Sequence, residues 1–141
     1  MIPGGTDPAT RTGLPRYGTV LVVDDEPLVR RVACKVLEDV FTEVLEASSA
    51  QEALDVAAAH PRDITLLLTD VVMPGMGGRA LSERMRTRHP RTLVLFMSAY
   101  TDDEVVLEGI RRANLEFIPK PFSVDGLRDK VLEVLGKRAS A

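Results

Sequence analysis

Strand-like and helix-like segments alternate five times along the 141-residue chain. Short runs rich in branched apolar residues predict strands at residues 19–23, 42–47, 64–69, 92–97 and 115–118. Each run is followed by apolar residues at the spacing of an amphipathic helix. Several runs are apolar throughout, which is typical of strands buried on both faces. The alternation therefore predicts an α/β fold, with helices on both faces of a parallel sheet.

Local signals mark the ends of the predicted helices. The last helix is expected to end at Gly136, because glycine is common just past a helix C-terminus. A further helix is expected over about 79–88, beyond the glycines that follow the third strand. The start signals are Pro27, the capping boxes of Ser49 with Glu52 and of Thr101 with Glu104, and Ser123 before the last helix.

These elements make up one domain, predicted over residues 19–136. Residues 1–18 are rich in glycine, proline and threonine and are expected to form a flexible linker or leader, and 137–141 a C-terminal tail. Right-handed crossovers restrict five such strands to few topologies, of which the doubly wound, flavodoxin-like order 2-1-3-4-5 is common. Its ligand crevice lies between strands 1 and 3.

Composition excludes several functions. A formal charge of −3 gives no electrostatic footprint for nucleic acid, so we expect no direct contact with it. The single Cys34 excludes an internal disulfide and a paired-cysteine metal site, which favours the reducing cytoplasm. No apolar run approaches the roughly 18 residues of a membrane span, and no signal peptide is evident, so we expect no membrane contact by this chain.

Polar side chains follow four of the predicted strands. Asp24 and Asp25 follow the first and Asp70 ends the third, so these acids are expected to meet in the crevice. Ser98 and Lys120 follow the fourth and fifth strands, beside it. Each feature has a simpler interpretation, as a helix cap, a strand end or a solvated charge. Their coincidence at one edge of one sheet favours a joint function.

The residue types indicate a chemistry. Three carboxylates in a small site repel one another, and a hard divalent cation such as Mg²⁺ removes the conflict. Lys120 suits a phosphoryl oxygen or Asp70 itself, and Ser98 supplies a hydroxyl. Together, these groups describe phosphoryl transfer onto an aspartate.

Four motifs carry a family resemblance: VVDDEP at 22–27, DVVMPGMGG at 70–78, SA at 98–99 and KPF at 120–122. Through them, and through their spacing, the chain from Thr19 to about Leu135 resembles the receiver domain of bacterial two-component response regulators. The resemblance implies that Asp70 accepts phosphate from the phosphohistidine of a histidine kinase or a histidine phosphotransfer protein. It implies a Mg²⁺ site formed by Asp24, Asp25, Asp70 and the backbone carbonyl of Val72, with Lys120 on the phosphoryl group and a cis Lys120–Pro121 bond.

The resemblance also implies a switch. Ser98 would turn toward the phosphoryl group while Phe117 moves inward, which changes the face formed by the fourth helix, fifth strand and fifth helix of the fold. A downstream target would bind that face, and phosphorylation-dependent homodimers are a further expectation.

By the same resemblance, Val72 and Tyr100 set the lifetime of the phosphoryl group. Neither side chain offers a good group to orient an attacking water, and Tyr100 would shield the phosphoryl group, so we expect slow self-dephosphorylation.

Alternatives remain open. A degenerate receiver would bind partners without phosphorylation, although the set of acids, Ser98 and Lys120 is intact. A Mg²⁺-dependent phosphatase with an aspartyl intermediate would require a second acid where this chain has Val72. A Rossmann nucleotide binder would require a glycine-rich turn after the first strand, where this chain has none. We therefore expect a signalling domain that catalyses only its own phosphorylation and dephosphorylation. It would be the receiver of a hybrid histidine kinase or a stand-alone regulator.

Overall fold

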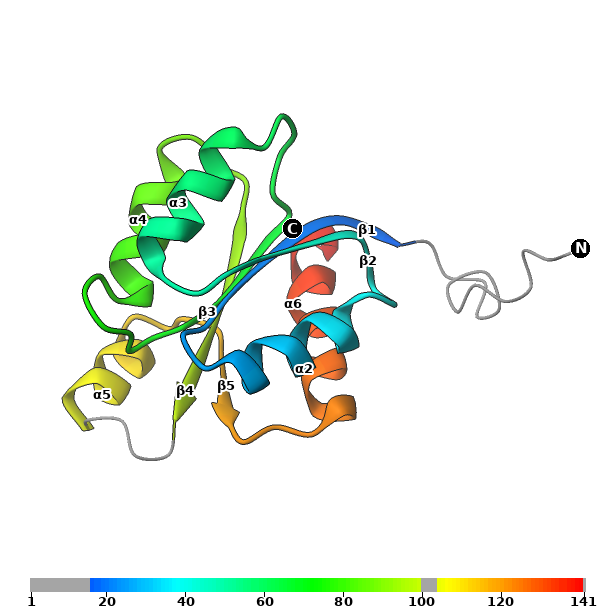
Figure 1. Cartoon of the computed structure of the whole chain (residues 1–141). Coiled ribbons are helices and arrows are strands. Elements are labelled where there is room, and N and C mark those ends of the chain that lie inside the picture. Colours follow the sequence, from blue (N-terminus) through cyan, green and yellow to red (C-terminus); the bar gives the residue numbers. More distant parts are fainter. Residues whose placement is uncertain (1–15, 100–103, 141) are drawn as a thin grey trace, which may run out of the picture.

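The computed structural model describes residues 16–99 and 104–140, without the side chains of 138–140. The described residues form a five-stranded parallel sheet in the order β2-β1-β3-β4-β5, the flavodoxin-like topology predicted from the sequence (Figure 1). The strands are β1 (Tyr17–Val23), β2 (Phe41–Ala47), β3 (Leu66–Asp70), β4 (Leu93–Ala99) and β5 (Phe117–Lys120). The helices are α2 (Pro27–Leu37), α3 (Ala50–Ala59), α4 (Gly78–Arg86), α5 (Glu104–Arg112) and α6 (Val124–Ser140).

The sheet is buried on both faces. Alternate residues of β1 enter different cores: Val20 and Val22 pack with the side chains of α2 and α6, whereas Leu21 and Val23 pack with those of α3 and α4. The Cys34 side chain lies in the first of these cores. A smaller cluster places α5 against β4. These two apolar layers hold the carboxyl ends of the strands at one common edge.

Two of the expected caps are present, and a third lies outside the described residues. The Ser49 hydroxyl accepts the Glu52 N–H at 3.1 Å, and Ser123 accepts the Gly126 N–H at 2.9 Å. The Glu52 carboxylate in turn accepts the N–H of Ser48 at 2.6 Å, one residue earlier than a capping box requires. Thr101 falls among residues 100–103, which are not described.

Several predicted boundaries are wrong by about two residues. β1 begins at Tyr17, inside the predicted linker, and β3 begins at Leu66 rather than at residue 64. β4 continues to Ala99, so Ser98 lies within this strand and does not follow it.

Two further differences have a clear local cause. The last helix does not end at Gly136, because this glycine does not take the left-handed backbone that a glycine cap uses, and α6 continues to Ser140. The fifth strand begins two residues later than expected. Asn114, with φ 55°, turns the chain after α5, and the Leu115 N–H bonds back to Ile110, so pairing with β4 starts at Phe117. Lys120 consequently belongs to the strand itself.

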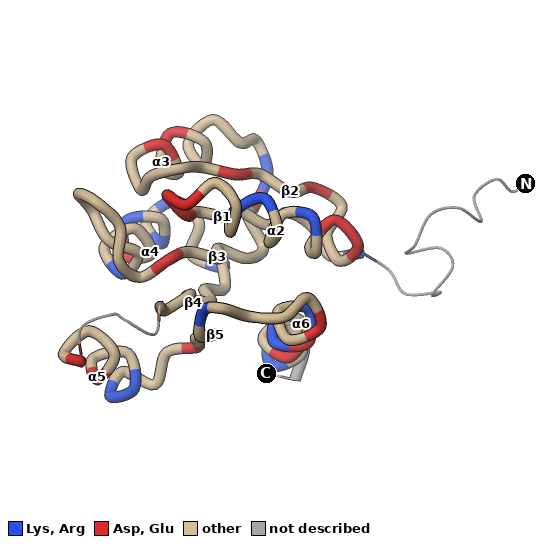
Figure 2. Tube along the Cα trace, turned by 60° about the horizontal axis from the view of Figure 1, so that its bottom comes forward, with Lys and Arg blue, Asp and Glu red and all other residues tan. Residues whose placement is uncertain are grey.

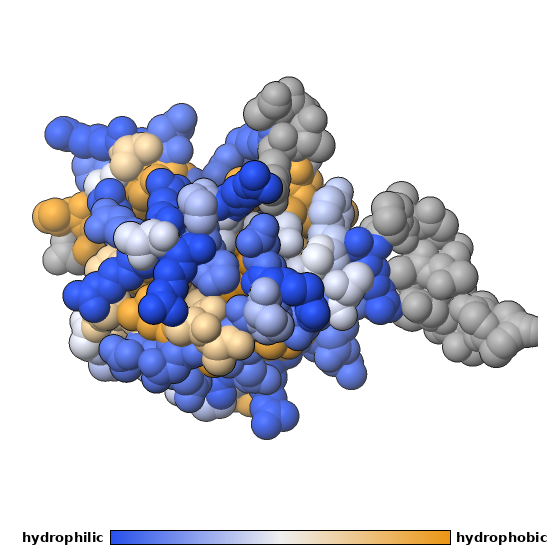
Figure 3. All heavy atoms as spheres, turned by 90° about the horizontal axis from the view of Figure 1, so that it is seen from above, coloured by the Kyte–Doolittle hydropathy of each residue, from blue (hydrophilic) through white to orange (hydrophobic). Residues whose placement is uncertain are grey.

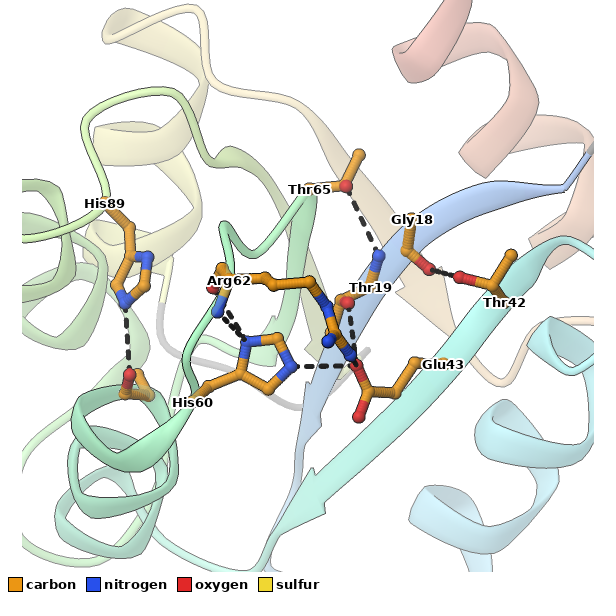
Figure 4. Close-up of polar contacts among 9 residues, drawn as sticks. Gly18, Thr19, Thr42, Glu43, His60, Arg62, Thr65 and His89 are labelled. Atoms are coloured by element: carbon orange, nitrogen blue, oxygen red, sulfur yellow. Dashed lines mark hydrogen bonds and ion pairs between the residues drawn. The ribbon is translucent and has the colours of Figure 1, made fainter.

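A polar cluster at the amino-terminal edge of the sheet joins β1, β2 and the segment after α3 (Figure 4). The Glu43 carboxylate accepts the Thr19 hydroxyl at 3.0 Å and contacts His60 Nε2 at 2.8 Å and Arg62 at 3.2 Å. Hydrogen bonds from His60 and Thr19 hold the pKa of Glu43 below its ordinary value. This cluster fixes the edge opposite to the carboxyl ends of the strands.

The outer surface is largely polar where Figure 3 shows it from above, with apolar side chains in small groups. Among the described residues, no helix has the length and hydrophobicity needed to cross a bilayer.

The pairing of Glu116 with α6 generates a pH prediction. Glu116 contacts Lys137 at 2.5 Å and Lys130 at 3.1 Å, and these contacts lower the pKa of Glu116. A lowered pKa in the folded state stabilises the fold above the unfolded pKa, and this contribution is lost as the pH falls through the folded pKa. Glu116→Gln should therefore lower the free energy of unfolding by up to about 1 kcal/mol at neutral pH. The difference should shrink at acid pH, where Glu116 of the wild type is protonated. Urea unfolding at both pH values measures the difference.

Glu83→Gln is the matched control, because Glu83 is exposed and makes no ion pair among the described residues. A Glu116→Gln difference from wild type that does not change between neutral and acid pH would contradict the assignment.

Candidate functional site

The four strand ends singled out by the sequence meet at the carboxyl edge of the sheet. Asp24 directly follows β1, Asp70 ends β3, Ser98 lies near the end of β4 and Lys120 ends β5. All four residues are buried, whereas the neighbouring Asp25 is exposed. Figure 2 shows acidic positions after β1 and at the end of β3, and a basic position at the end of β5. The site is thus built by strands that lie far apart in the sequence.

The Lys120 ammonium lies at the centre of this site. Its Nζ is 3.1 Å from Asp70 Oδ2, 3.2 Å from Asp24 Oδ2 and 3.0 Å from Glu26 Oε1. The Lys120 side chain is 8% exposed. Burial would lower the pKa of Lys120, but the surrounding carboxylates outweigh it and raise the pKa above its ordinary value. Lys120 is therefore charged and partly neutralises the acids.

The acids form a group that could bind a metal ion. One carboxylate oxygen from each of Asp24, Asp25 and Asp70 lies within 4.8 Å of the others. Burial raises the pKa of Asp24, although the Glu26 N–H and the Lys120 ammonium both stabilise its charged form. A cation among these oxygens would offset the same cost of burial. The donor set is entirely oxygen, which suits a hard divalent cation.

The segment after Asp70 returns to the sheet through a close backbone contact. The Gly78 N–H donates to the Val71 carbonyl at 2.9 Å, and a Cβ at Gly78 would overlap the Asp70 carbonyl oxygen. Only glycine fits at this approach. Gly75 has a φ of 78°, the left-handed conformation that glycine favours. Gly75 and Gly78 therefore allow the loop after β3 to fold back beside Asp70.

The other predicted site residues occupy different positions. Val72 lies two residues beyond Asp70, and its side chain is exposed. Phe117 is half-buried against Val71, Phe96 and Ile110. The Lys120–Pro121 bond is cis. Tyr100 lies outside the described residues.

Two contacts were not predicted from the sequence. Glu26, whose side chain is 59% exposed, shares Lys120 with the two buried aspartates. Arg30 of α2 donates from Nη1 to the backbone oxygen of Asp24 at 2.8 Å. The run of acids at 24–26 was a signal for Glu26, but nothing in the helical pattern of α2 distinguishes Arg30 from the adjacent Arg31.

Comparison with known proteins identifies the family. Residues 20–132 match the family model of the response regulator receiver domain. The chain belongs to this family, which is a signalling domain of two-component systems.

Relatives and solved structures agree with this assignment. The chain is 35% identical over 127 residues to the sensor kinase CckA of Brucella abortus (strain 2308), covering 90% of this chain and 13% of that protein. It is 32% identical over 108 residues to the DNA-binding transcriptional regulator NtrC of Escherichia coli (strain K12), covering 77% of this chain and 23% of that protein. The crystal structure of the receiver domain from the hybrid histidine kinase CckA superposes with a TM-score of 0.68 at 33% identity, covering 84% of this chain and 99% of that one. The chain thus spans only a minor part of the sensor kinase and of the transcriptional regulator.

Proposed function

We propose that this chain is a phosphoacceptor: Asp70 receives a phosphoryl group from the phosphohistidine of a histidine kinase or a histidine phosphotransfer protein, in a reaction that requires Mg²⁺. The observation that carries the proposal is the buried contact of Lys120 with Asp70, beside two further aspartates. Lysine, carboxylates and a hard cation are the groups that phosphoryl transfer requires.

Each residue has a distinct role in this reaction. An Asp70 carboxylate oxygen attacks phosphorus, forming an O–P bond as the P–N bond to the donor imidazole breaks and its electron pair returns to nitrogen. Lys120, already within hydrogen-bond distance of Asp70, stabilises the negative charge on the phosphoryl oxygens. Asp24, Asp25 and Asp70 would hold Mg²⁺ together with the Val72 carbonyl. The ion would neutralise charge shared by the carboxylates and the phosphoryl group.

The same site would drive a conformational switch. Ser98, buried near the end of β4, would turn its hydroxyl toward the phosphoryl group. Phe117, which is half-buried beside β4, would move inward at the same time. The pair would alter the face formed by α5, β5 and α6, where a downstream target or a second phosphorylated copy would bind. The exposed Val72 side chain has no polar group that could orient an attacking water. Hydrolysis of the aspartyl phosphate would therefore be slow.

An apolar surface beside the site fits the phosphodonor. Leu28 and Val32 of α2 are 80% and 48% exposed, and Val124 of α6 is 49% exposed. Leu28 and Val32 line a hollow of about 220 Å³ that reaches Lys120, Pro121 and Phe122. Exposed apolar side chains that adjoin a reactive centre are typical of a docking site. We assign this surface to the helix of the donor that carries the phosphohistidine.

The protein that contains this domain is proposed by analogy. The match to a sensor kinase and to a hybrid-kinase receiver favours a receiver of a hybrid kinase over a stand-alone regulator. The free, buried Cys34 suits the reducing cytoplasm. The second candidate function is a degenerate receiver, a phosphate-independent interaction module.

Intact-mass spectrometry after incubation with Mg²⁺ and a small acyl phosphate tests the phosphoacceptor role. Wild type should gain one phosphoryl group, and the adduct should be absent in Asp70→Asn or after chelation of Mg²⁺. Asp63→Asn, which changes an exposed aspartate away from the site, should be phosphorylated like wild type. A folded wild-type protein that binds Mg²⁺ but gains no adduct would favour the degenerate receiver.

A second experiment tests the docking surface. Leu28→Arg should slow transfer from the autophosphorylated kinase region of Brucella abortus CckA by on the order of tenfold, since a buried charge disrupts an apolar contact. The rate with the small acyl phosphate should not change. Val105→Arg is the control, because Val105 is 78% exposed on α5, away from the hollow. Transfer from the kinase at the wild-type rate in Leu28→Arg would refute the assignment.

A further inference from the structure

Both backbone polar groups of Asp24 are held. The Asp24 N–H, which belongs to the preceding peptide unit, continues the β1–β2 ladder by donating to the Ala47 carbonyl at 3.2 Å. The Asp24 carbonyl accepts from Arg30 Nη1 at 2.8 Å. Because a peptide unit is planar, fixing this carbonyl also fixes the direction in which the chain enters Asp25. The contact therefore governs how two of the three acids are presented.

Arg30 is itself held in place. Its Nε donates to Glu46 Oε1 at 2.8 Å, and its side chain is only 16% exposed. Glu46 lies on β2 opposite Val22 of β1. The guanidinium thus bridges from α2 to β2 across the turn that carries the acids, using two different nitrogens. A lysine has one nitrogen and cannot reproduce this fork.

We propose that Arg30 is a positioning residue that preorganises Asp24 and Asp25 for the divalent cation; this role rests on the proposed function and deepens it. The hydrogen bonds of Arg30 run to the Asp24 carbonyl and to Glu46, so it acts through the Asp24 backbone.

The charge of Arg30 and its hydrogen bond to the Asp24 carbonyl should have opposite effects on Mg²⁺ affinity. A cation near a metal site repels Mg²⁺, so the loss of the positive charge alone would tighten binding. Loss of the hydrogen bond to the Asp24 carbonyl frees the peptide unit and loosens the ligands, which weakens binding. The sign of the change in Mg²⁺ affinity therefore separates the two effects.

The test is a titration of the full chain with Mg²⁺ alone, followed by NMR, for Arg30→Met, Arg30→Lys and Arg31→Met. Positioning predicts that both Arg30 variants lose affinity, by on the order of tenfold. Arg31, the next residue on the same helix, is exposed, and Arg31→Met should remain within about twofold of wild type. Arg30→Lys keeps the charge and serves as the test if Arg30→Met does not fold.

A second measurement separates positioning from general destabilisation. In phosphorylation by the small acyl phosphate, the Mg²⁺ concentration for half-maximal rate should rise in the Arg30 variants, while the rate at saturating Mg²⁺ should stay within about twofold of wild type. Unchanged or tighter Mg²⁺ binding in Arg30→Met, with normal binding by wild type, would overturn the role of Arg30 alone. Wild type that binds no Mg²⁺ would refute the proposed function as well.

Discussion

The buried contact between one ammonium and several carboxylates is the interaction on which this site depends. Asp24 and Asp70 are both buried, and without a neighbouring cation their charges would raise the free energy of the fold. Lys120 lies within 3.2 Å of both and of Glu26, so it supplies that cation. A divalent ion bound by the aspartates would relieve Lys120 of this role and leave it available to a phosphoryl group.

The fold makes this contact possible because the sheet is paired throughout and packed on both faces. Strands β1, β3 and β5 are separated by long stretches of sequence, yet the apolar layers on both faces align their carboxyl ends. The close approach of Gly78 to the Asp70 carbonyl returns the following loop to the site. At the opposite edge, the Glu43 cluster joins β1, β2 and the segment after α3. The packed strands therefore position Asp70 and Lys120, and contacts from the loops and α2 hold the residues around them.

The fold and the meeting of the strand-end side chains could be predicted because their signals are local or follow from topology. Buried parallel strands are apolar throughout, and the strand order then places Asp24, Asp70 and Lys120 together. The continuation of α6 past Gly136 could not be predicted, since a glycine marks a helix end only if it takes a left-handed conformation. The contacts of Glu26 and Arg30 depend on side-chain directions in three dimensions, which periodicity does not encode.

The most direct measurement is a crystal structure with Mg²⁺ and beryllium fluoride, which mimics a phosphoryl group on a carboxylate. We predict the fluoride adduct on Asp70, the metal ion among Asp24, Asp25 and Asp70, and Lys120 Nζ moved from Asp24 and Glu26 onto a fluorine. An adduct on another residue, or a Lys120 that keeps all three carboxylate contacts beside a bound ion, would contradict the role assigned to this lysine and to the acids around it.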